Sequence, residues 1–175
     1  MDFAPASFDV ITANHVVEHL RDPIVSMRRI RNWLSPDGVM VIEVPNAEAV
    51  YHAPRTRFHF AHLYNFTVET LTEVGKRAGF TPISVELASG TLHVNIAFKL
   101  GPESAGTTVN RERASRTRER VEAHTPVRHL FSHHPYSRVV GNVLRPLREK
   151  LAIGSLQDAR AVLDALYLPH VERLV

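Results

Sequence analysis

The sequence predicts an α/β fold, and two patterns carry that prediction. Over residues 8–87, short apolar runs of strand type alternate with stretches in which apolar residues recur at helical spacing. In addition, one strand, helix and strand follow each other as a crossover, whose two strands should be parallel with a right-handed connection. A parallel sheet needs cover on both faces, so helices should flank it.

Two apolar segments have the character of strands inside such a sheet. Residues 8–13 are mostly apolar and β-branched, as expected of a strand buried on both faces. Residues 39–44 have the same character, and Pro45 closes them. We therefore expect Val10 and Val41 to lie on neighbouring strands that run in the same direction.

The helix between these strands has recognisable ends. Asp22 provides a capping acceptor, and Pro23 follows at the first helical position. Apolar residues then recur at helical spacing as far as Leu34. The Ser-Pro-Asp-Gly segment at 35–38 is expected to stop the helix and turn the chain.

A second helix and two further strands complete the first hundred residues. Thr67 is a candidate N-cap, and Gly79 is placed to end the helix that it opens. Residues 80–87 predict a strand. Residues 92–99 alternate strictly between apolar and mostly polar positions, which predicts a half-exposed strand paired with 80–87 in an antiparallel hairpin at the sheet edge.

Composition divides the chain into a domain, a linker and a tail. Residues 1–100 form the α/β domain with a net charge of about −1, residues 101–110 are typical of a linker, and residues 111–175 form a basic helical tail; residues 101–175 together carry about +4. Helices are expected at about 111–124, 136–151 and 156–168.

The basic tail has acidic residues interspersed among its arginines in the run RERASRTRER. This pattern favours a solvated, salt-bridged helix face over a nucleic-acid-binding or membrane-anchoring stripe. The tail histidines lack metal-ligand spacing and are interpreted as surface residues.

Composition also excludes several classes of site. The 175 residues include no cysteine, which rules out disulfides, thiolate metal sites and cysteine nucleophiles. Apolar runs fall short of the roughly 20 residues that span a bilayer. The start MDFAPASFD lacks the features of a signal peptide, so we predict a cytoplasmic protein.

Four short motifs follow one another in a fixed order. They are Phe8-Asp9, Glu18-His19, Asp22-Pro23 and Leu-Ser-Pro-Asp-Gly at 34–38. In this order they resemble the second half of the class I S-adenosylmethionine-dependent methyltransferases. The segment 58–80 looks like the branches of that family that methylate sugars and other small metabolites.

The resemblance covers about residues 3–99 and implies a partial Rossmann-like methyltransferase sheet, strands four to seven of the family. It implies S-adenosyl-L-methionine as cofactor and a small-molecule methyl acceptor, a sugar or related metabolite. The family's glycine-rich cofactor motif is lacking, because the first glycine is Gly38. We therefore expect a fragment or truncated reading frame, or else a chain completed by a homo-oligomer or another chain. A non-catalytic remnant or protein-interaction module is the alternative.

Sheet geometry and the resemblance together predict which residues form the site. Ligands bind beyond the carboxyl ends of parallel strands, so Asn14 and His15 should line the methionine end of the cofactor; Asn14 could instead simply end its strand. His62 and His59 are candidate bases for the acceptor, with Tyr64 assisting or packing, although a loop histidine can also serve only in hydrogen bonding. Ala61 stands where sugar C-methyltransferases carry an acid before the histidine.

The string His15-Val-Val-Glu18-His19 offers one further interpretation. Its spacing places His15, Glu18 and His19 on one helix face, where they could bind a metal as in inverted metallopeptidases. Some quinone-biosynthesis methyltransferases use a similar motif for a divalent cation. The favoured interpretation is a structural helix beside the cofactor pocket, with metal-assisted methyl transfer and a peptidase as alternatives.

Overall fold

The computed structural model describes residues 3–88, 92–105, 110–136, 140 and 143–146. The chain divides into two compact units, residues 1–131 and 132–175, which are considered separately. The predicted division into residues 1–100, 101–110 and 111–175 stays a prediction.

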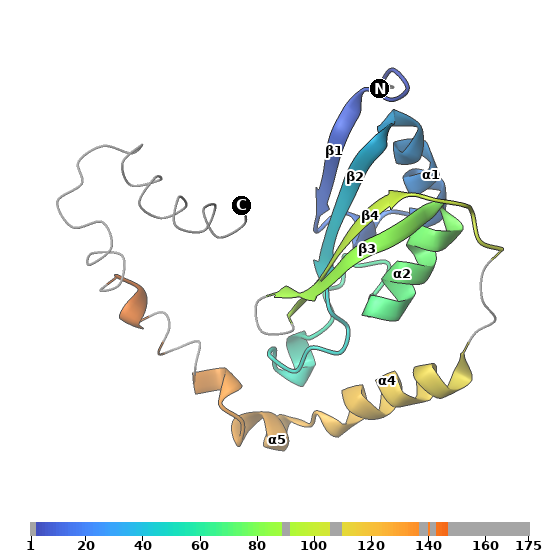
Figure 1. Ribbon diagram of the computed structural model, residues 1–175. Coiled ribbons are helices and arrows are strands. Elements are labelled where there is room, and N and C mark those ends of the chain that lie inside the picture. Colours follow the sequence, from blue (N-terminus) through green and yellow to red (C-terminus); the bar gives the residue numbers. More distant parts are fainter. Residues whose placement is uncertain (1–2, 89–91, 106–109, 137–139, 141–142, 147–175) are drawn as a thin grey trace. The chain divides into compact units, whose positions relative to one another are not determined.

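The first unit contains a four-stranded mixed sheet (Figure 1). In spatial order its strands are β1 (Phe8–Asn14), β2 (Leu34–Pro45), β4 (His93–Leu100) and β3 (Phe80–Leu87). β1 and β2 are parallel, whereas β2–β4 and β4–β3 are antiparallel. The predicted α/β fold class is confirmed.

The crossover at the start of the chain agrees with the prediction. Val10 lies opposite Val39, and Thr12 lies opposite Val41, on strands that run in the same direction. The connecting helix α1 (Pro23–Trp33) is capped by Asp22, whose Oδ1 accepts from the backbone N–H of Val25 at 3.0 Å. This cap satisfies one of the free N–H groups of the first turn.

The segment 35–38 differs from its prediction. It does follow the end of α1, but it belongs to β2 instead of forming a separate turn. The ladder between β1 and β2 shifts register here, from Phe8 opposite Leu34 to Val10 opposite Val39. The extra residues of β2 are therefore accommodated as a bulge, a common way to absorb an insertion in a strand.

The second helix and the hairpin agree with the sequence pattern. Helix α2 (Val68–Arg77) starts with a capping box in which Thr67 and Thr70 satisfy each other's backbone N–H groups. Gly79 follows with a φ of 84°, a conformation that glycine adopts without strain. β3 and β4 pair as the predicted antiparallel hairpin, but β4 lies inside the sheet and β3 forms the edge.

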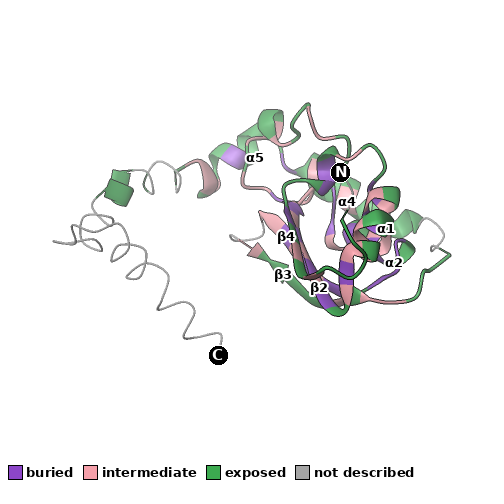
Figure 2. Ribbon diagram, turned by 90° about the horizontal axis from the view of Figure 1, so that it is seen from above, coloured by how far each residue is buried: buried purple, intermediate pink, exposed green. Residues whose placement is uncertain are grey.

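The core lies between the sheet and the two helices (Figure 2). Alternate residues of the two inner strands point toward it and are fully buried: Met40, Ile42, Val44, Val94, Ile96 and Phe98. Met27 of α1 and Leu71 of α2 pack into the same cluster, so both helices cover the same face. Arg28 Nη2 also donates to the carbonyl of Arg77 at 3.1 Å and joins the two helices.

The sequence predicted that β1 would be buried on both faces, and this prediction is wrong. Only Ala13 is buried along this strand, and Val10 is 61% exposed. Ile11 and Ala13 pack against the core, whereas Val10 lies on the opposite face, which α1 and α2 leave uncovered; in the described part of the chain, the helices expected on both faces of the sheet are on one face only. A β-branched apolar sequence forms the strand, but its side chains are buried only on a face that helices cover.

The tail begins with the expected helix, α4 (Arg111–Ala123), followed by α5 (Pro126–Leu130). α4 has no buried residue, and Arg116 pairs with Glu112 one turn away, which confirms a solvated, salt-bridged face. In the second unit, residues 134–136, 140 and 143–146 are helical. The predicted helix at 156–168, and the end of that at 136–151, lie outside the described residues.

Two tail histidines contradict the surface interpretation. His124 and His129 are each only 7% exposed, and their rings are joined by a 3.0 Å contact between Nε2 of His124 and Nδ1 of His129. Arg57 contacts His124 Nδ1 and donates to the carbonyl of Val121 at 3.2 Å. These two histidines are buried because Arg57, in the loop that follows β2, packs against His124.

None of the helices in the described ranges combines the length and the apolar character that crossing a membrane requires.

Candidate functional site

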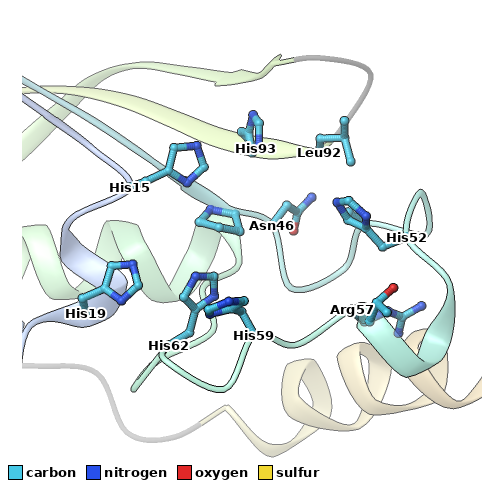
Figure 3. Close-up of a pocket in the computed structure, with 12 residues that line it drawn as sticks. His15, His19, Asn46, His52, Arg57, His59, His62, Leu92 and His93 are labelled. Atoms are coloured by element: carbon cyan, nitrogen blue, oxygen red, sulfur yellow. The ribbon is translucent and has the colours of Figure 1, made fainter. Parts of the chain in front are cut away.

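A histidine-lined cavity lies at the carboxyl ends of the parallel strands (Figure 3). β1 ends at Asn14 and β2 at Pro45, at the same edge of the sheet. The cavity has a volume of about 390 Å³. Six histidines line it: His15, His19, His52, His59, His62 and His93. Open α/β sheets bind ligands at this edge, so the position alone marks a candidate site.

His15 is held in an unusual backbone conformation at the end of β1. Its φ is 53°, in the left-handed region that residues with a side chain rarely adopt, and its N–H donates to the carbonyl of Glu43 at 2.9 Å. Nδ1 of the ring lies 3.4 Å from Oε1 of Glu18, and Nε2 lies 3.6 Å from Oε1 of Glu43. The ring therefore lies between two carboxylates. Strained backbone of this kind is concentrated at functional sites.

Glu18 is a buried acid without a hydrogen-bond partner for its carboxylate. It lies in the short 3-10 helix η1 (Val17–His19) and is only 1% exposed. Neither carboxylate oxygen has a hydrogen bond in the described structure, although His15 and His19 lie within 4 Å. A buried carboxylate in this state is costly, and such groups are retained mainly where they serve a site.

The carbonyl of Glu18 also holds the loop that carries the candidate bases. It accepts from the N–H groups of Leu63 and Tyr64 at 2.9 and 3.2 Å. The ring of His19, one residue on, contacts the carbonyl of Ala61 through Nδ1 at 3.0 Å. These bonds position His62, whose ring centroid lies 4.8 Å from that of His19.

His62 and His59 line the cavity as a pair of neighbouring rings. Their centroids are 5.1 Å apart, and Nδ1 of His59 accepts from the N–H of Ala61 at 3.3 Å. Burial lowers the pKa of His62 below its ordinary value, while the nearby carboxylate of Glu18 opposes this change in pKa. His62 is thus biased toward the neutral form, which can accept a proton.

The structure brings three of the five predicted site residues into the cavity. His15, His59 and His62 line it, but Asn14 and Tyr64 do not. Asn14 sits opposite Glu43 in the ladder. The hydroxyl of Tyr64 donates to the carbonyl of Arg21 at 3.1 Å, below the loop that holds the two histidines. The functional roles assigned to these five residues remain predictions.

The spacing-based metal set is arranged differently from the single helix face that its spacing suggested. The 3-10 helix starts only at Val17, so His15 lies outside it. Among the described residues, potential ligand atoms gather in two groups, each within 4.8 Å. The two groups are Glu18, His19 and His62, and His15, Glu43 and His93.

Comparison with known proteins identifies the domain. Residues 2–85 match the family described as a methyltransferase domain. This segment, just under half of the chain, is therefore similar to methyltransferase domains. The resemblance read from the four sequence motifs is thereby confirmed. No match was found among the curated proteins.

Several solved methyltransferase structures are similar in fold. The N1-methyltransferase for 1,6-didemethyltoxoflavin from Burkholderia thailandensis, crystallised with that compound and S-adenosylhomocysteine, is 21% identical over 57% of this chain and 46% of its own, with a TM-score of 0.45. An S-adenosylmethionine-dependent methyltransferase from Aquifex aeolicus is 12% identical over 56% of this chain and 48% of its own, with a TM-score of 0.46.

A third similar structure is the Haloferax volcanii complex between the Trm112 methyltransferase activator and a methyltransferase. It is 11% identical over 58% of this chain and 57% of its own, with a TM-score of 0.49. The chain spans about half the length of these solved structures. At TM-scores below 0.5 these structures carry no further argument, and the similarity to methyltransferases rests on residues 2–85.

Within this methyltransferase segment and the strand that follows, sequence reasoning missed Glu43 and His93. Both lie on the less buried face of alternating strands, and the antiparallel ladder places His93 opposite Pro45, two residues beyond Glu43. The available signal was the regular alternation of 92–99, which puts His93 on the polar face. Its nearness to Glu43 depends on β4 lying next to β2, which the sequence does not show.

One residue that lines the cavity, Arg57, also contacts the tail. Arg57 lines the cavity, and burial lowers its pKa from the ordinary value. Nearby, Oε1 of Glu48 accepts from the hydroxyl of Thr117 at 2.7 Å, and Oε2 lies 3.3 Å from Nη1 of Arg120. Helix α4 therefore buttresses the loop after β2, a contact that composition alone does not reveal.

Proposed function

We propose that this chain takes part in S-adenosylmethionine-dependent methyl transfer to a small-molecule acceptor. The observation that supports this best is the methyltransferase-domain match over residues 2–85, whose parallel strands end at the histidine-lined cavity. The cavity, at about 390 Å³, falls within the range of small-molecule sites.

His15 is proposed to contact the methionine end of the donor, with Asn14 fixing the end of β1 behind it. When bound, the donor supplies an electrophilic methyl group on a sulfonium sulfur. The ring of His15 lies between the carboxylates of Glu18 and Glu43, so this part of the cavity has negative groups close to it. Such a surrounding favours a positively charged ligand.

His62 is proposed as the base that receives the acceptor's proton. As the acceptor oxygen takes up the methyl group that the bound donor would supply, its hydroxyl proton would pass to a ring nitrogen of His62. The lowered pKa of His62 keeps the ring neutral and ready for this step near pH 7. His59 would pack against His62, and Tyr64 would support the loop through Arg21.

A sugar or a related polyhydroxylated metabolite is the proposed acceptor. The segment 58–80 resembles the branches of the family that act on such compounds, although Ala61 replaces an acid expected next to His62. Glu18, in the 3-10 helix η1, can act as the acid beside His62, because its buried carboxylate favours the protonated form of His62. The pair would stabilise the charge that His62 gains during the reaction.

Binding of S-adenosylhomocysteine tests the proposal. Isothermal titration, with the melting temperature measured in parallel, should show one-site binding and a ligand-dependent rise in stability. Asn14→Ala should weaken binding, whereas Asn32→Ala, at the far end of α1, should not. A folded chain that shows neither heat nor a change in melting temperature would overturn the proposal.

The role of His62 needs a separate measurement. His62→Gln should leave S-adenosylhomocysteine binding intact while methyl transfer from labelled S-adenosylmethionine to a sugar acceptor falls by about 10²–10⁴-fold, the usual contribution of a general base. His133→Gln, an exposed tail histidine, is the matched control. Equal turnover of His62→Gln and the control would remove His62 from the mechanism.

A further inference from the structure

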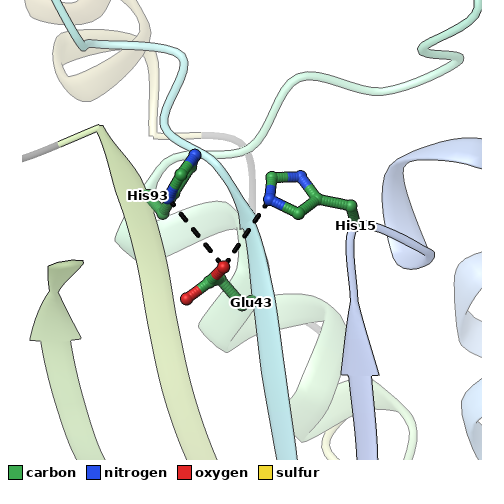
Figure 4. A group of neighbouring side chains, drawn as sticks. All are labelled: His15, Glu43 and His93. Carbon is green, nitrogen blue, oxygen red and sulfur yellow. Dashed lines mark ion pairs between the residues drawn. The ribbon is translucent and has the colours of Figure 1, made fainter. Parts of the chain in front are cut away.

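We propose that His15, Glu43 and His93 form a binding site for a divalent transition-metal ion of the Zn²⁺ type. The three side chains come from three adjacent strands: His15 from the end of β1, Glu43 from β2 and His93 from β4 (Figure 4). The two imidazole rings lie on either side of the Glu43 carboxylate, with their centroids 4.8 Å apart.

The spacing of the donor atoms suits an ion between them. Oε1 of Glu43 lies 3.6 Å from Nε2 of His15 and 3.9 Å from Nδ1 of His93. Both distances exceed an ordinary hydrogen bond. Bonds of about 2.0–2.2 Å at tetrahedral angles put neighbouring ligand atoms ~3.4 Å apart. These two distances would have to shorten by only a few tenths of an ångström, and the ligand atoms of all three residues lie within 4.8 Å of one another.

Glu18 provides the second, independent observation. Its carboxylate is 1% exposed, has no hydrogen bond in the described structure, and places Oε1 at 3.4 Å from Nδ1 of His15. Metal-bound histidines usually donate their other ring nitrogen to such a carboxylate. An ion on Nε2 of His15 would fix the proton on Nδ1 and give the buried Glu18 a charge-assisted partner.

The composition of the donors selects the class of ion. Two imidazoles and one carboxylate suit Zn²⁺ and similar transition metals, whereas Mg²⁺ and Ca²⁺ prefer sites built from oxygen. His15 and His93 also line the cavity, so a fourth position would face it. That position would accept water or an oxygen of a small ligand, as in open zinc sites.

The neighbouring group of Glu18, His19 and His62 is the competing location. His62 comes from the loop before α2, whereas His15, Glu43 and His93 lie on or directly beside paired strands. Ligands on rigid elements hold their geometry better than ligands on loops. We therefore place the ion between His15, Glu43 and His93, and assign Glu18 the role of outer partner to His15.

Metal titration of the full chain tests the site without methyl donor or acceptor, so its outcome is independent of the proposed methyl transfer. Co²⁺ added to metal-free protein should give the visible absorption of a four-coordinate site with one ion per chain, and Zn²⁺ should displace it. His93→Gln and Glu43→Gln should each weaken Co²⁺ binding by more than about 100-fold, beyond the effect of losing an outer partner. Glu43→Gln keeps nearly the same shape and serves if His93→Gln does not fold.

The matched variants separate the two groups of ligands. His62→Gln should bind Co²⁺ like the unaltered chain, while Glu18→Gln should weaken binding by about 10–100-fold, as expected of an outer partner. A folded chain that binds no Co²⁺ would overturn the proposal. Binding that is lost in His62→Gln but retained in His93→Gln would equally overturn it, by placing the ion in the other group.

Discussion

The inner and the edge strands of the sheet are built from similar residues but are buried to very different extents. On β2 and β4, every second side chain is fully buried, as at Ile42 and Ile96. On the edge strands, Val10 of β1 is 61% exposed and Ile83 of β3 is 52% exposed. The difference teaches that residue type forms the strand, whereas burial depends on which face of the sheet the helices cover and on how many strands flank the residue.

The same comparison explains where the site lies. Glu43 and His93 belong to the inner strands, and His15 follows directly on the edge strand β1. The inner strands fix their residues from both sides, while His15 is held by its backbone bond to Glu43 and by an unusual φ. The edge strand therefore contributes the residue with the most strained backbone to the cavity.

The largest contrast should appear when the same truncation is made on an inner and an edge strand. Ile42→Ala should lower the free energy of unfolding by about 2–5 kcal/mol, because it leaves a cavity in the core. Ile83→Ala should cost about 1 kcal/mol or less, because half of that side chain is already in water. Urea denaturation measures both. Equal costs would break the distinction between inner and edge strands.

The packing of α2 on the inner strands gives the next largest effect. Alanine usually stabilises a helix relative to glycine, but a Cβ at Gly75 would clash with Cε1 of the buried Phe98 ring. Gly75→Ala should therefore destabilise the protein by about 1–3 kcal/mol through overpacking. A double variant with Phe98→Leu should recover part of that loss in a thermal melt. A stabilising Gly75→Ala would mean that α2 does not pack closely on β4.

The start of α2 gives a smaller effect. Thr67→Ala removes the capping box with Thr70 and should reduce the free energy of unfolding by about 1 kcal/mol. Thr67→Ser keeps the capping hydroxyl and should stay near the stability of the unaltered chain. Chemical denaturation of the two variants side by side measures the cap, and indistinguishable curves would show that it contributes nothing.

Local signals allowed much of the fold to be predicted from the sequence. Asp22, Thr67 and Gly79 mark helix ends through bonds to their immediate neighbours, so short motifs were sufficient. The exposure of Val10 could not be predicted, because it depends on which face of the sheet the two helices cover. The bulge at 35–38 also depends on the pairing partner.

Only the site residues that local sequence signals mark could be predicted. His15 follows directly from the end of β1, and His62 lies in a loop that the resemblance singled out. His93 joins the site because β4 inserts between β2 and β3, a pairing between distant segments. The burial of His124 has the same origin, since it depends on Arg57, far away in the sequence.

The smallest expected effect concerns the pH dependence of stability through His62. Burial lowers its pKa in the folded chain, so the unfolded chain binds the proton more readily. Stability from this group should be fully present above about pH 6.5, the ordinary value, and should be lost as the pH falls toward the lowered pKa. Urea denaturation between pH 7.5 and about pH 5 should show a smaller loss for His62→Gln than for the unaltered chain. Parallel curves would contradict the burial of His62.

The central claim is that ligands bind at the carboxyl ends of β1 and β2, and a nuclear magnetic resonance titration tests it most directly. S-adenosylhomocysteine added to the ¹⁵N-labelled chain should shift the backbone signals of Asn14, His15 and Asn46, which lie at that edge. The signals of the edge strand β3 should stay in place. Shifts confined to β3, or a spectrum unchanged at saturating ligand, would contradict the account.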